Sequence, residues 1–243
     1  MEKKEILLSK RMQMVAGMVS KGNVTADIGC DHGFVSIYLI EQEICPRMIA
    51  MDVNEGPLLR AKEHIAQRGL ESSIDVRLSD GIDKLQDGEA ESIIIAGMGG
   101  RLVMKILSSH MDRVKHLKEI ILQPQSELHF VRQFLSENDL HIVQEDMVEE
   151  AGKYYPCIKA VYSEGKKEAY TDVENWYGPL LLNQKHPVLY DYLQKEKEMF
   201  EQITEQIKQN AKKVDTEEAK EDTIQNRLRQ IAVALAYFDK QEV

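Results

Sequence analysis

The chain has 243 residues, of which 43% are hydrophobic and 30% charged, and its formal net charge is −10. This length accommodates one α/β core plus an appendage, so two modules are expected. No run of about 18 apolar residues occurs, and the opening stretch MEKKEILLSKRMQ lacks the apolar segment of a secretion signal. These features argue against a membrane protein and lead us to expect a cytoplasmic one.

The three cysteines and the distribution of basic residues restrict the choice of partners. Cys30, Cys45 and Cys157 form no C-x-x-C pair, so we expect reduced thiols and no metal site. The acidic net charge disfavours nucleic-acid binding in general, because phosphates are neutralised by lysine and arginine. Residues 101–118 nevertheless carry five basic side chains against Asp112 alone. They form either a local basic face or ordinary solvated helix charges.

Short β-rich runs alternate with helical patterns from residue 23 to about residue 164, which is typical of βαβ units. Only residues 149–156 separate the last two runs, which predicts an antiparallel hairpin. The fold expected is α/β, with a Rossmann-like, seven-stranded, mostly parallel sheet whose last strand is antiparallel. The predicted strands are 24–28, 48–53, 74–78, 92–96, 119–123, 141–148 and 157–162, and the predicted helices include 56–67, 102–109 and 128–137.

A polar break at residues 165–187 precedes a purely helical pattern. Two heptad-like stripes separated by the polar stretch 212–222 predict an antiparallel coiled-coil hairpin, with Glu196 interrupting the first stripe. We therefore expect a Rossmann-like domain with an N-terminal helix at residues 1–164, and a linker with the helical hairpin at 165–243. The stripes are Leu189, Leu193, Glu196, Phe200, Ile203 and Ile207, and then Ile224, Leu228, Ile231, Leu235 and Phe238.

The turn after the first predicted strand, in ADIGCDHG, is the strongest functional signal. Asp27 and Gly29 end the strand and Gly33 opens a helix, so a ligand can approach the backbone and the free N–H groups of the helix. A dinucleotide fingerprint requires G-x-G-x-x-G, but Asp31 and Phe34 occupy the second and third glycine positions. NAD is therefore disfavoured.

The spacing D-x-G-x-x-x-G resembles instead the first motif of class I methyltransferases, which use S-adenosylmethionine. Asp52 closes the second strand, where it can accept hydrogen bonds from both ribose hydroxyls. Asp80 resembles the family acid that accepts a hydrogen bond from the adenine amino group. Asp31 replaces the usual middle glycine, and the adjacent His32 either orients a ligand or caps the helix.

The AGMGG segment at residues 96–100 stands where amino-methylating enzymes of this class carry an Asn/Asp-Pro-Pro-aromatic motif. A ring nitrogen already presents its lone pair in the plane of the base. Its methylation needs mainly alignment with the methyl group and stabilisation of the resulting cation. The glycines either admit a flat base or simply make a tight strand-to-helix turn.

Together, LSKRM, ADIGCDHG, Asp52, Asp80 with Gly81, IAGMGG, LQPQ and GKYY resemble the bacterial tRNA (adenine(22)-N1)-methyltransferases over essentially the whole chain. This resemblance implies methyl transfer from S-adenosylmethionine to adenine N1 in the D-loop region of tRNA. No general base is expected, since N1 of neutral adenine has no proton to lose. The expected cofactor-binding residues are Asp27, Gly29, Cys30, Gly33, Asp52, Val53, Asp80, Gly81, Ala96, Gly97, Met98, Gly99 and Gly100, with Asp31 and His32 as the catalytic candidates.

Other residues are candidates for contact with the tRNA. Gln123 and Gln125 end the fifth strand, where ligands of such sheets lie, although they could equally serve as caps or in loop hydrogen bonds. A tyrosine can stack on a splayed base and a lysine can hold phosphate, although surface tyrosines also pack against loops and surface lysines are ordinarily solvated. The expected substrate-binding residues are Lys10, Arg11, Arg101, Gln123, Gln125, Lys153 and Tyr155.

Two other functions remain open from the sequence. One is a methyltransferase of a small molecule or a protein, favoured by the acidic charge; a steep salt dependence of a tRNA-requiring activity would exclude it. The other is a non-catalytic scaffold that retained the cofactor fold, against which the acids at 27, 52 and 80 speak. We expect a monomer with tRNA as its partner.

Overall fold

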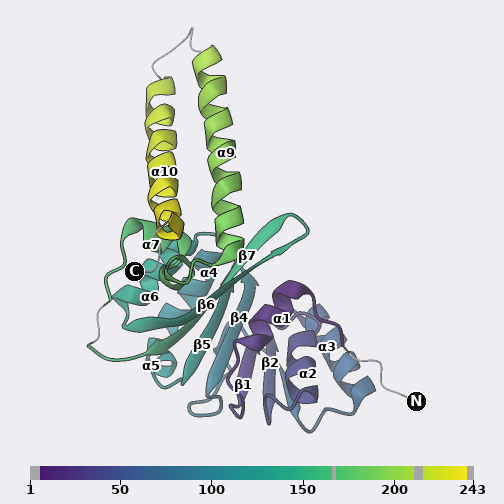
Figure 1. Cartoon of the computed structure of the whole chain (residues 1–243). Coiled ribbons are helices and arrows are strands. Elements are labelled where there is room, and N and C mark those ends of the chain that lie inside the picture. Colours follow the sequence, from purple (N-terminus) through teal and green to yellow (C-terminus); the bar gives the residue numbers. More distant parts are fainter. Residues whose placement is uncertain (1–5, 166–167, 211–215, 240–243) are drawn as a thin grey trace. The chain divides into compact units, whose positions relative to one another are not determined.

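A computed structural model describes residues 6–165, 168–210 and 216–239 (Figure 1). The chain divides into two compact units, Met1–Ala169 and Tyr170–Val243. Within the described ranges, none of the helices has both the length and the apolar character needed to cross a membrane.

The first unit contains a seven-stranded sheet in the order β3-β2-β1-β4-β5-β7-β6. β1 to β5 pair in parallel, whereas β7 is antiparallel to both β5 and β6, so the expected Rossmann-like sheet is confirmed. Because β1 and β4 are neighbours at the sheet centre, the turns that follow them open at the same edge. The strands are β1 (Thr25–Ile28), β2 (Met48–Asp52), β3 (Ile74–Leu78), β4 (Ser92–Met98), β5 (Glu119–Pro124), β6 (Leu140–Glu150) and β7 (Lys153–Tyr162).

The hairpin of β6 and β7 is longer than predicted. Glu150 pairs with Lys153, so only Ala151 and Gly152 form the turn, with φ of 53° and 78°. Two positive φ values suit the tight turns that match strand twist. The sequence pattern missed this extension because its side chains are largely polar on both faces of the ribbon. Lys153 and Tyr155 therefore lie within β7 and do not precede it.

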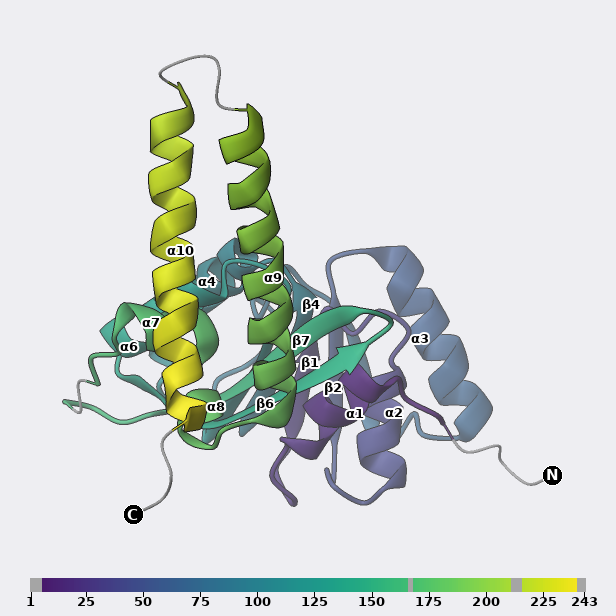
Figure 2. The ribbon, with the colours of Figure 1, turned by 45° about the horizontal axis from the view of Figure 1, so that its top comes forward.

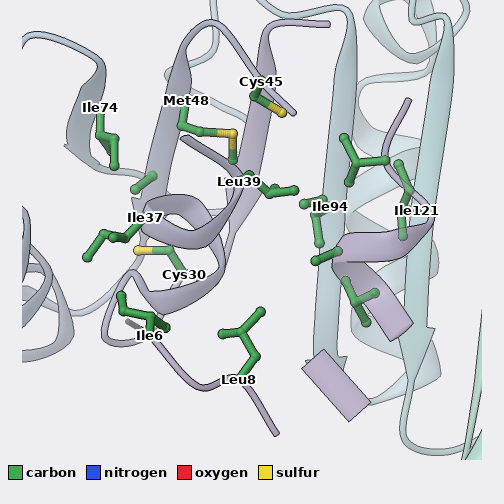
Figure 3. Packing of buried hydrophobic residues seen from close by; sticks show 14 of the residues in the cluster. Ile6, Leu8, Cys30, Ile37, Leu39, Cys45, Met48, Ile74, Ile94 and Ile121 are labelled. Atoms are coloured by element: carbon green, nitrogen blue, oxygen red, sulfur yellow. The ribbon is translucent and has the colours of Figure 1, made fainter. Parts of the chain in front are cut away.

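Helices cover both faces of the sheet. Figure 3 shows the apolar cluster on the face that α1 (Lys10–Gly17), α2 (Phe34–Glu41) and α3 (Glu55–Arg68) cover. Ile94 and Ile121 belong to this cluster, while their buried neighbours in sequence point to the other face, as strand alternation requires. The opposite face carries α4 (Gly100–Ser109), α5 (Met111–Val114) and α6 (Leu128–Glu137) (Figure 1).

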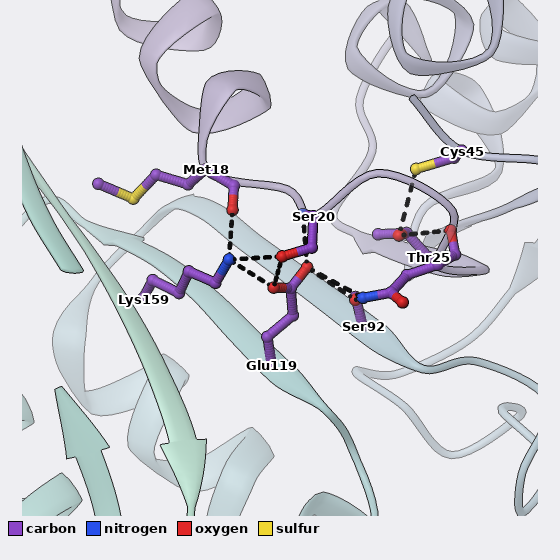
Figure 4. Close-up of polar contacts among 8 residues, drawn as sticks. Met18, Ser20, Thr25, Cys45, Ser92, Glu119 and Lys159 are labelled. Atoms are coloured by element: carbon purple, nitrogen blue, oxygen red, sulfur yellow. Dashed lines mark hydrogen bonds and ion pairs between the residues drawn. The ribbon is translucent and has the colours of Figure 1, made fainter. Parts of the chain in front are cut away.

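A buried polar network anchors the segment after α1 to the starting ends of the strands (Figure 4). The Glu119 carboxylate accepts hydrogen bonds from Ser20 Oγ at 2.6 Å and Ser92 Oγ at 2.9 Å, and it pairs with Lys159 Nζ at 2.6 Å. Burial acts to raise the pKa of Glu119, but the lysine and the hydrogen bonds outweigh it and hold the pKa below its usual value. The network thus fixes α1 against the sheet.

The second unit is helical, with α7 (Asp172–Tyr177), α8 (Pro179–Asn183), α9 (Pro187–Asn210) and α10 (Thr216–Asp239). The predicted break at residues 165–187 is wrong in part, because it contains α7 and α8. A capping box of Thr171 and Glu174 starts α7, and Pro179 occupies the first turn of α8. α9 and α10 lie side by side and run antiparallel (Figure 2). Of the predicted polar stretch 212–222, residues 212–215 lie outside the described residues, and α10 begins at Thr216.

The stripes predicted for the hairpin are only partly buried. Leu189, Leu193 and Ile231 are buried, whereas the stripe residues nearer the hairpin turn are half-exposed. Glu196, which interrupts the pattern, is buried and accepts a hydrogen bond from Arg227 Nη2 at 2.8 Å. A carboxylate in the stripe is thus tolerated because an arginine of the facing helix neutralises it.

Candidate functional site

The turn after β1 has a left-handed backbone at three positions. Gly29, Asp31 and Gly33 have φ of 74°, 48° and 73°. A Cβ on Gly29 would meet the Met98 side chain, and one on Gly33 would lie 3.2 Å from Ala61 Cβ of α3. Gly29 therefore lets the Met98 side chain lie directly against the strand end, whereas Gly33 allows α2 to pack closely against α3.

A cavity of about 440 Å³ opens at the carboxyl ends of β1, β2 and β4. It gathers many of the predicted cofactor residues, but Asp27, Cys30, Gly33, Gly99 and Gly100 do not line it. Its lining consists of Arg11, Met12, Ile28, Gly29, Asp31, Asp52, Val53, Asn54, Pro57, Ser79, Asp80, Gly81, Ala96, Gly97, Met98, Leu102, Ile106 and Gln125.

Two of the predicted acids share this cavity. Asp52, at the end of β2, is buried, and its Oδ1 accepts a hydrogen bond from the backbone N–H of Asn54 at 2.9 Å. That bond fixes the carboxylate and leaves the second oxygen for a ligand. Asp80 follows β3 and is exposed at the same cavity. The two carboxylates can therefore accept hydrogen bonds from one ligand that carries hydroxyl and amino groups.

Asp27 lies in a second, adjoining cavity of about 250 Å³, not in the first. The two cavities share Gly29, Asp31, Ala96, Arg11 and Met12, so they are neighbouring parts of one depression. Asp27 is 4% exposed and accepts a hydrogen bond from Ser36 Oγ at 2.8 Å. Burial raises its pKa to about 6; the bond from Ser36 lowers it and the charge of Asp52 raises it further. A buried carboxylate whose pKa is raised by burial is stabilised in its charged form by a positively charged ligand group.

The two catalytic candidates lie at the rim. Asp31 lines both cavities and its side chain is 72% exposed, with its Oδ1 3.6 Å from His32 Nε2. The ring of His32 stacks against Phe34 and His64, at centroid distances of 5.6 and 5.8 Å. His32 borders only the second cavity. Its ring is held by packing against the two neighbouring rings, which the sequence pattern did not indicate. Cys30 also borders that cavity, and burial raises the pKa of its thiol.

The AGMGG segment divides into two parts. Ala96, Gly97 and Met98 finish β4 and line the first cavity. Gly99 caps α4 and Gly100 is its first residue, where a Cβ would collide with the backbone of Ser126. Gly99 and Gly100 line neither cavity and serve the tight strand-to-helix turn.

The residues predicted to contact tRNA are not all exposed. Gln125 lines the first cavity, but Gln123 is 0% exposed and its Oε1 accepts a hydrogen bond from Arg11 Nη1 at 3.3 Å. Gln123 lines neither cavity. The Arg11 guanidinium also lies over the ring of Tyr155, 5.1 Å from its centroid, and so occupies a face of that ring.

Lys10 and Lys153 are exposed, and each of them neighbours Glu150. The Lys10 amide donates to Glu150 Oε1 at 2.7 Å, and Glu150 pairs with Lys153 across the β6–β7 turn. The basic stretch at residues 101–118 is largely neutralised, because its members pair with acids from other segments. The pairs are Arg101–Glu127 at 2.6 Å, Arg113–Asp87 at 2.8 Å and Lys118–Glu91 at 2.5 Å.

Apolar wall residues are the part of the site that the sequence analysis missed. Leu102 and Ile106 come from α4, and Pro57 comes from α3. Together with the predicted Val53, which is 60% exposed, they offer flat apolar surface beside Asp80. Such surface suits a planar heterocycle. In the described residues, no group of three or more His, Cys, Asp or Glu side chains is placed to hold a metal.

Comparison with known proteins gives consistent results. The family model described as tRNA (adenine(22)-N(1))-methyltransferase matches residues 25–232. The tRNA (adenine(22)-N(1))-methyltransferase of Bacillus subtilis (strain 168) is 35% identical over 221 residues, which are 89% of this chain and 91% of that protein.

Solved structures show the same fold. A putative tRNA (m1A22) methyltransferase of Streptococcus pneumoniae, solved with S-adenosyl-L-methionine, superposes with a TM-score of 0.83 at 30% identity, covering 94% of this chain and 100% of that one. A protein of M. capricolum, solved with S-adenosyl-homocysteine, has a TM-score of 0.80 at 23% identity, over 96% of this chain and 99% of that one. The latter likeness bears on the fold alone.

Proposed function

Because this chain belongs to the tRNA (adenine(22)-N(1))-methyltransferase family, we propose that the depression at the ends of β1, β2 and β4 is the site of its reaction. The chain transfers a methyl group from S-adenosylmethionine to N1 of adenine 22 in the D-loop region of tRNA. Family membership sets aside a small-molecule or protein substrate and a non-catalytic scaffold.

The residues of the first cavity fit the adenosyl part of the cofactor. Asp52 accepts hydrogen bonds from the ribose hydroxyls, and Asp80 accepts one from the adenine amino group, with Val53 and Leu102 against the ring. The observation that carries this assignment is the presence of both carboxylates and both apolar side chains in one cavity. Gly97 lines this cavity without a Cβ, which leaves space beside Gln125 and Arg11 for the chain of the ligand.

The methionine end belongs to the second cavity, where Asp27 faces the ammonium group. Bound S-adenosylmethionine supplies an electrophilic methyl group on its sulfonium. The protein contributes alignment, since adenine N1 presents its lone pair without losing a proton and no general base is needed. We assign Asp31 to stabilise the cationic methylated base, because its exposed carboxylate borders both cavities, with His32 as its neighbour.

The substrate contacts are proposed from exposure. Lys10 and Lys153 are exposed beside the β6–β7 turn and can hold tRNA phosphates. Arg101 pairs with Glu127 but is 85% exposed, so a phosphate can replace that acid. Gln125 faces the cavity, where it can reach the target base. We further propose a monomer, because one chain supplies every residue of both cavities, and a cytoplasmic site of action, because the substrate is tRNA.

The test is methyl incorporation into an unmodified tRNA transcript and into the same transcript with adenine 22 replaced by guanine. The assignment requires incorporation into the first only, with a rate that falls as salt is added. Equal incorporation into both transcripts would contradict it. Size-exclusion chromatography with light scattering tests the monomer.

A further inference from the structure

Arg11 occupies an unusual place for a residue outside the βαβ units. It comes from α1, yet it lines both cavities. Its Nη1 lies 3.8 Å from the position that a Cβ on Gly97 would take, at the end of β4. The guanidinium therefore reaches the middle of the depression, where the two cavities meet.

The charges around Arg11 are one-sided. Among the described residues lining the two cavities, Arg11 is the one lysine or arginine, whereas the acids are Asp27, Asp31, Asp52 and Asp80. The amino-acid end of S-adenosylmethionine carries one carboxylate, which those four acids would repel. Its hydroxyl, amino, ammonium and sulfonium groups match the acids. The ligand's single anion thus has one matching cation in the depression.

Arg11 is held in place but its charge is not neutralised. Gln123 Oε1 accepts one of its hydrogen bonds and the Tyr155 ring lies beneath it. Within the described part of the chain, no carboxylate lies within ion-pair distance of this guanidinium, whereas Arg68, Arg77 and Arg132 each have such a partner. A guanidinium has five N–H donors in a planar fork that fits a carboxylate, so most of its donors remain for a ligand.

We propose that Arg11 binds the carboxylate of the methionine moiety of S-adenosylmethionine, with Gln123 and Tyr155 holding the guanidinium in place. This inference rests on the proposed function. It reassigns Arg11 from the tRNA phosphate contact expected from the sequence to the cofactor. It also explains why α1 is anchored so firmly to the sheet, since movement of α1 would displace the carboxylate site.

The test compares ligands with and without the carboxylate by calorimetry in the absence of tRNA. 5′-Methylthioadenosine retains the adenosyl part but lacks the whole amino-acid end, and decarboxylated S-adenosylmethionine lacks the carboxylate alone. We expect Arg11→Gln to weaken binding of S-adenosylmethionine by roughly 10- to 100-fold and to change binding of the two truncated ligands by less than about threefold. Arg11→Lys should recover part of the loss, because it keeps the charge but not the fork.

Arg60→Gln is the matched control, because Arg60 is exposed on α3 and lines neither cavity. It should bind all three ligands like the wild type, and thermal melts should show that every variant is folded. Equal weakening of all three ligands by Arg11→Gln would mean that Arg11 only shapes the site. If Arg11→Gln leaves the S-adenosylmethionine affinity unchanged and raises the KM for tRNA, Arg11 binds a tRNA phosphate, as expected from the sequence. Either result overturns the proposal, whereas a wild type that binds none of the ligands would refute the proposed function itself.

Discussion

The substitution Asp27→Asn should have opposite effects on stability and on cofactor binding. Burial raises the pKa of Asp27 from 3.8 to about 6, so the ionised side chain destabilises the folded protein near neutral pH. Two pKa units correspond to about 3 kcal/mol. Replacing the ionised side chain by a neutral amide should therefore stabilise the folded protein by this amount. The amide forms a weaker hydrogen bond with Ser36, however, which offsets about 1 kcal/mol of the stabilisation. The net expectation is a variant that is about 2 kcal/mol more stable, with a Tm about 4 to 8 °C higher.

The pH dependence follows from the direction of this shift. Below pH 3.8 the carboxyl is protonated in both the folded and the unfolded protein, so its charge costs nothing. Between the unfolded and folded pKa values the unfolded chain loses the proton first, and the wild type loses stability as the pH rises. The Tm difference between Asp27→Asn and the wild type should therefore grow from pH 4 to pH 6 and stay constant above about pH 7.

Thermal melts across this pH range, with and without S-adenosylmethionine, provide the assay. Asp80→Asn is the control, since Asp80 is exposed at the neighbouring cavity and its removal should not raise the Tm. The stabilisation by cofactor should be smaller for Asp27→Asn, because the substitution removes the carboxylate that we propose as the partner of the cofactor's ammonium group. A lower Tm for Asp27→Asn at pH 7.5, or a gain that does not vary with pH, would refute the reasoning.

Further predictions follow from other contacts. Asp52→Ala should weaken S-adenosylmethionine binding by roughly 1.5 to 3 kcal/mol in calorimetry; unchanged affinity would rule out the ribose contact. Gly29→Ala places a side chain in the left-handed region and against Met98. The backbone strain, about 1 to 2 kcal/mol, should lower the Tm, and the displacement of Met98 should weaken cofactor binding. Lys10→Ala combined with Lys153→Ala should raise the KM for tRNA several-fold and leave the Kd of the cofactor unchanged; an altered Kd would contradict the phosphate assignment.

The parallel sheet could be predicted because buried strands leave continuous apolar runs in the sequence. The β6–β7 extension could not, since Glu149 to Tyr154 pair through backbone atoms while their side chains are mostly polar. α7 and α8 were missed for a related reason. They are only six and five residues long, too short to show a helical period, and the capping box of Thr171 was the available signal.

The candidate site was predictable where a residue's place in the chain fixes its place in space. Asp52 and Asp80 follow neighbouring parallel strands, so they had to meet at one edge of the sheet. The spacing of residues along the sequence does not show where a side chain points. For this reason the sequence did not predict that Asp27 lines a separate cavity or that Gln123 is buried. The position of Arg11 depends on how α1 packs, which no motif in the sequence records.

The central claim is that this depression aligns the ring nitrogen of one adenine with the methyl group of the cofactor. It is tested by digesting the methylated tRNA transcript to nucleosides and separating 1-methyladenosine from N6-methyladenosine by chromatography and mass spectrometry. The structure predicts 1-methyladenosine from position 22, in the absence of an Asn/Asp-Pro-Pro-aromatic motif after β4. N6-methyladenosine as the first product would contradict the account.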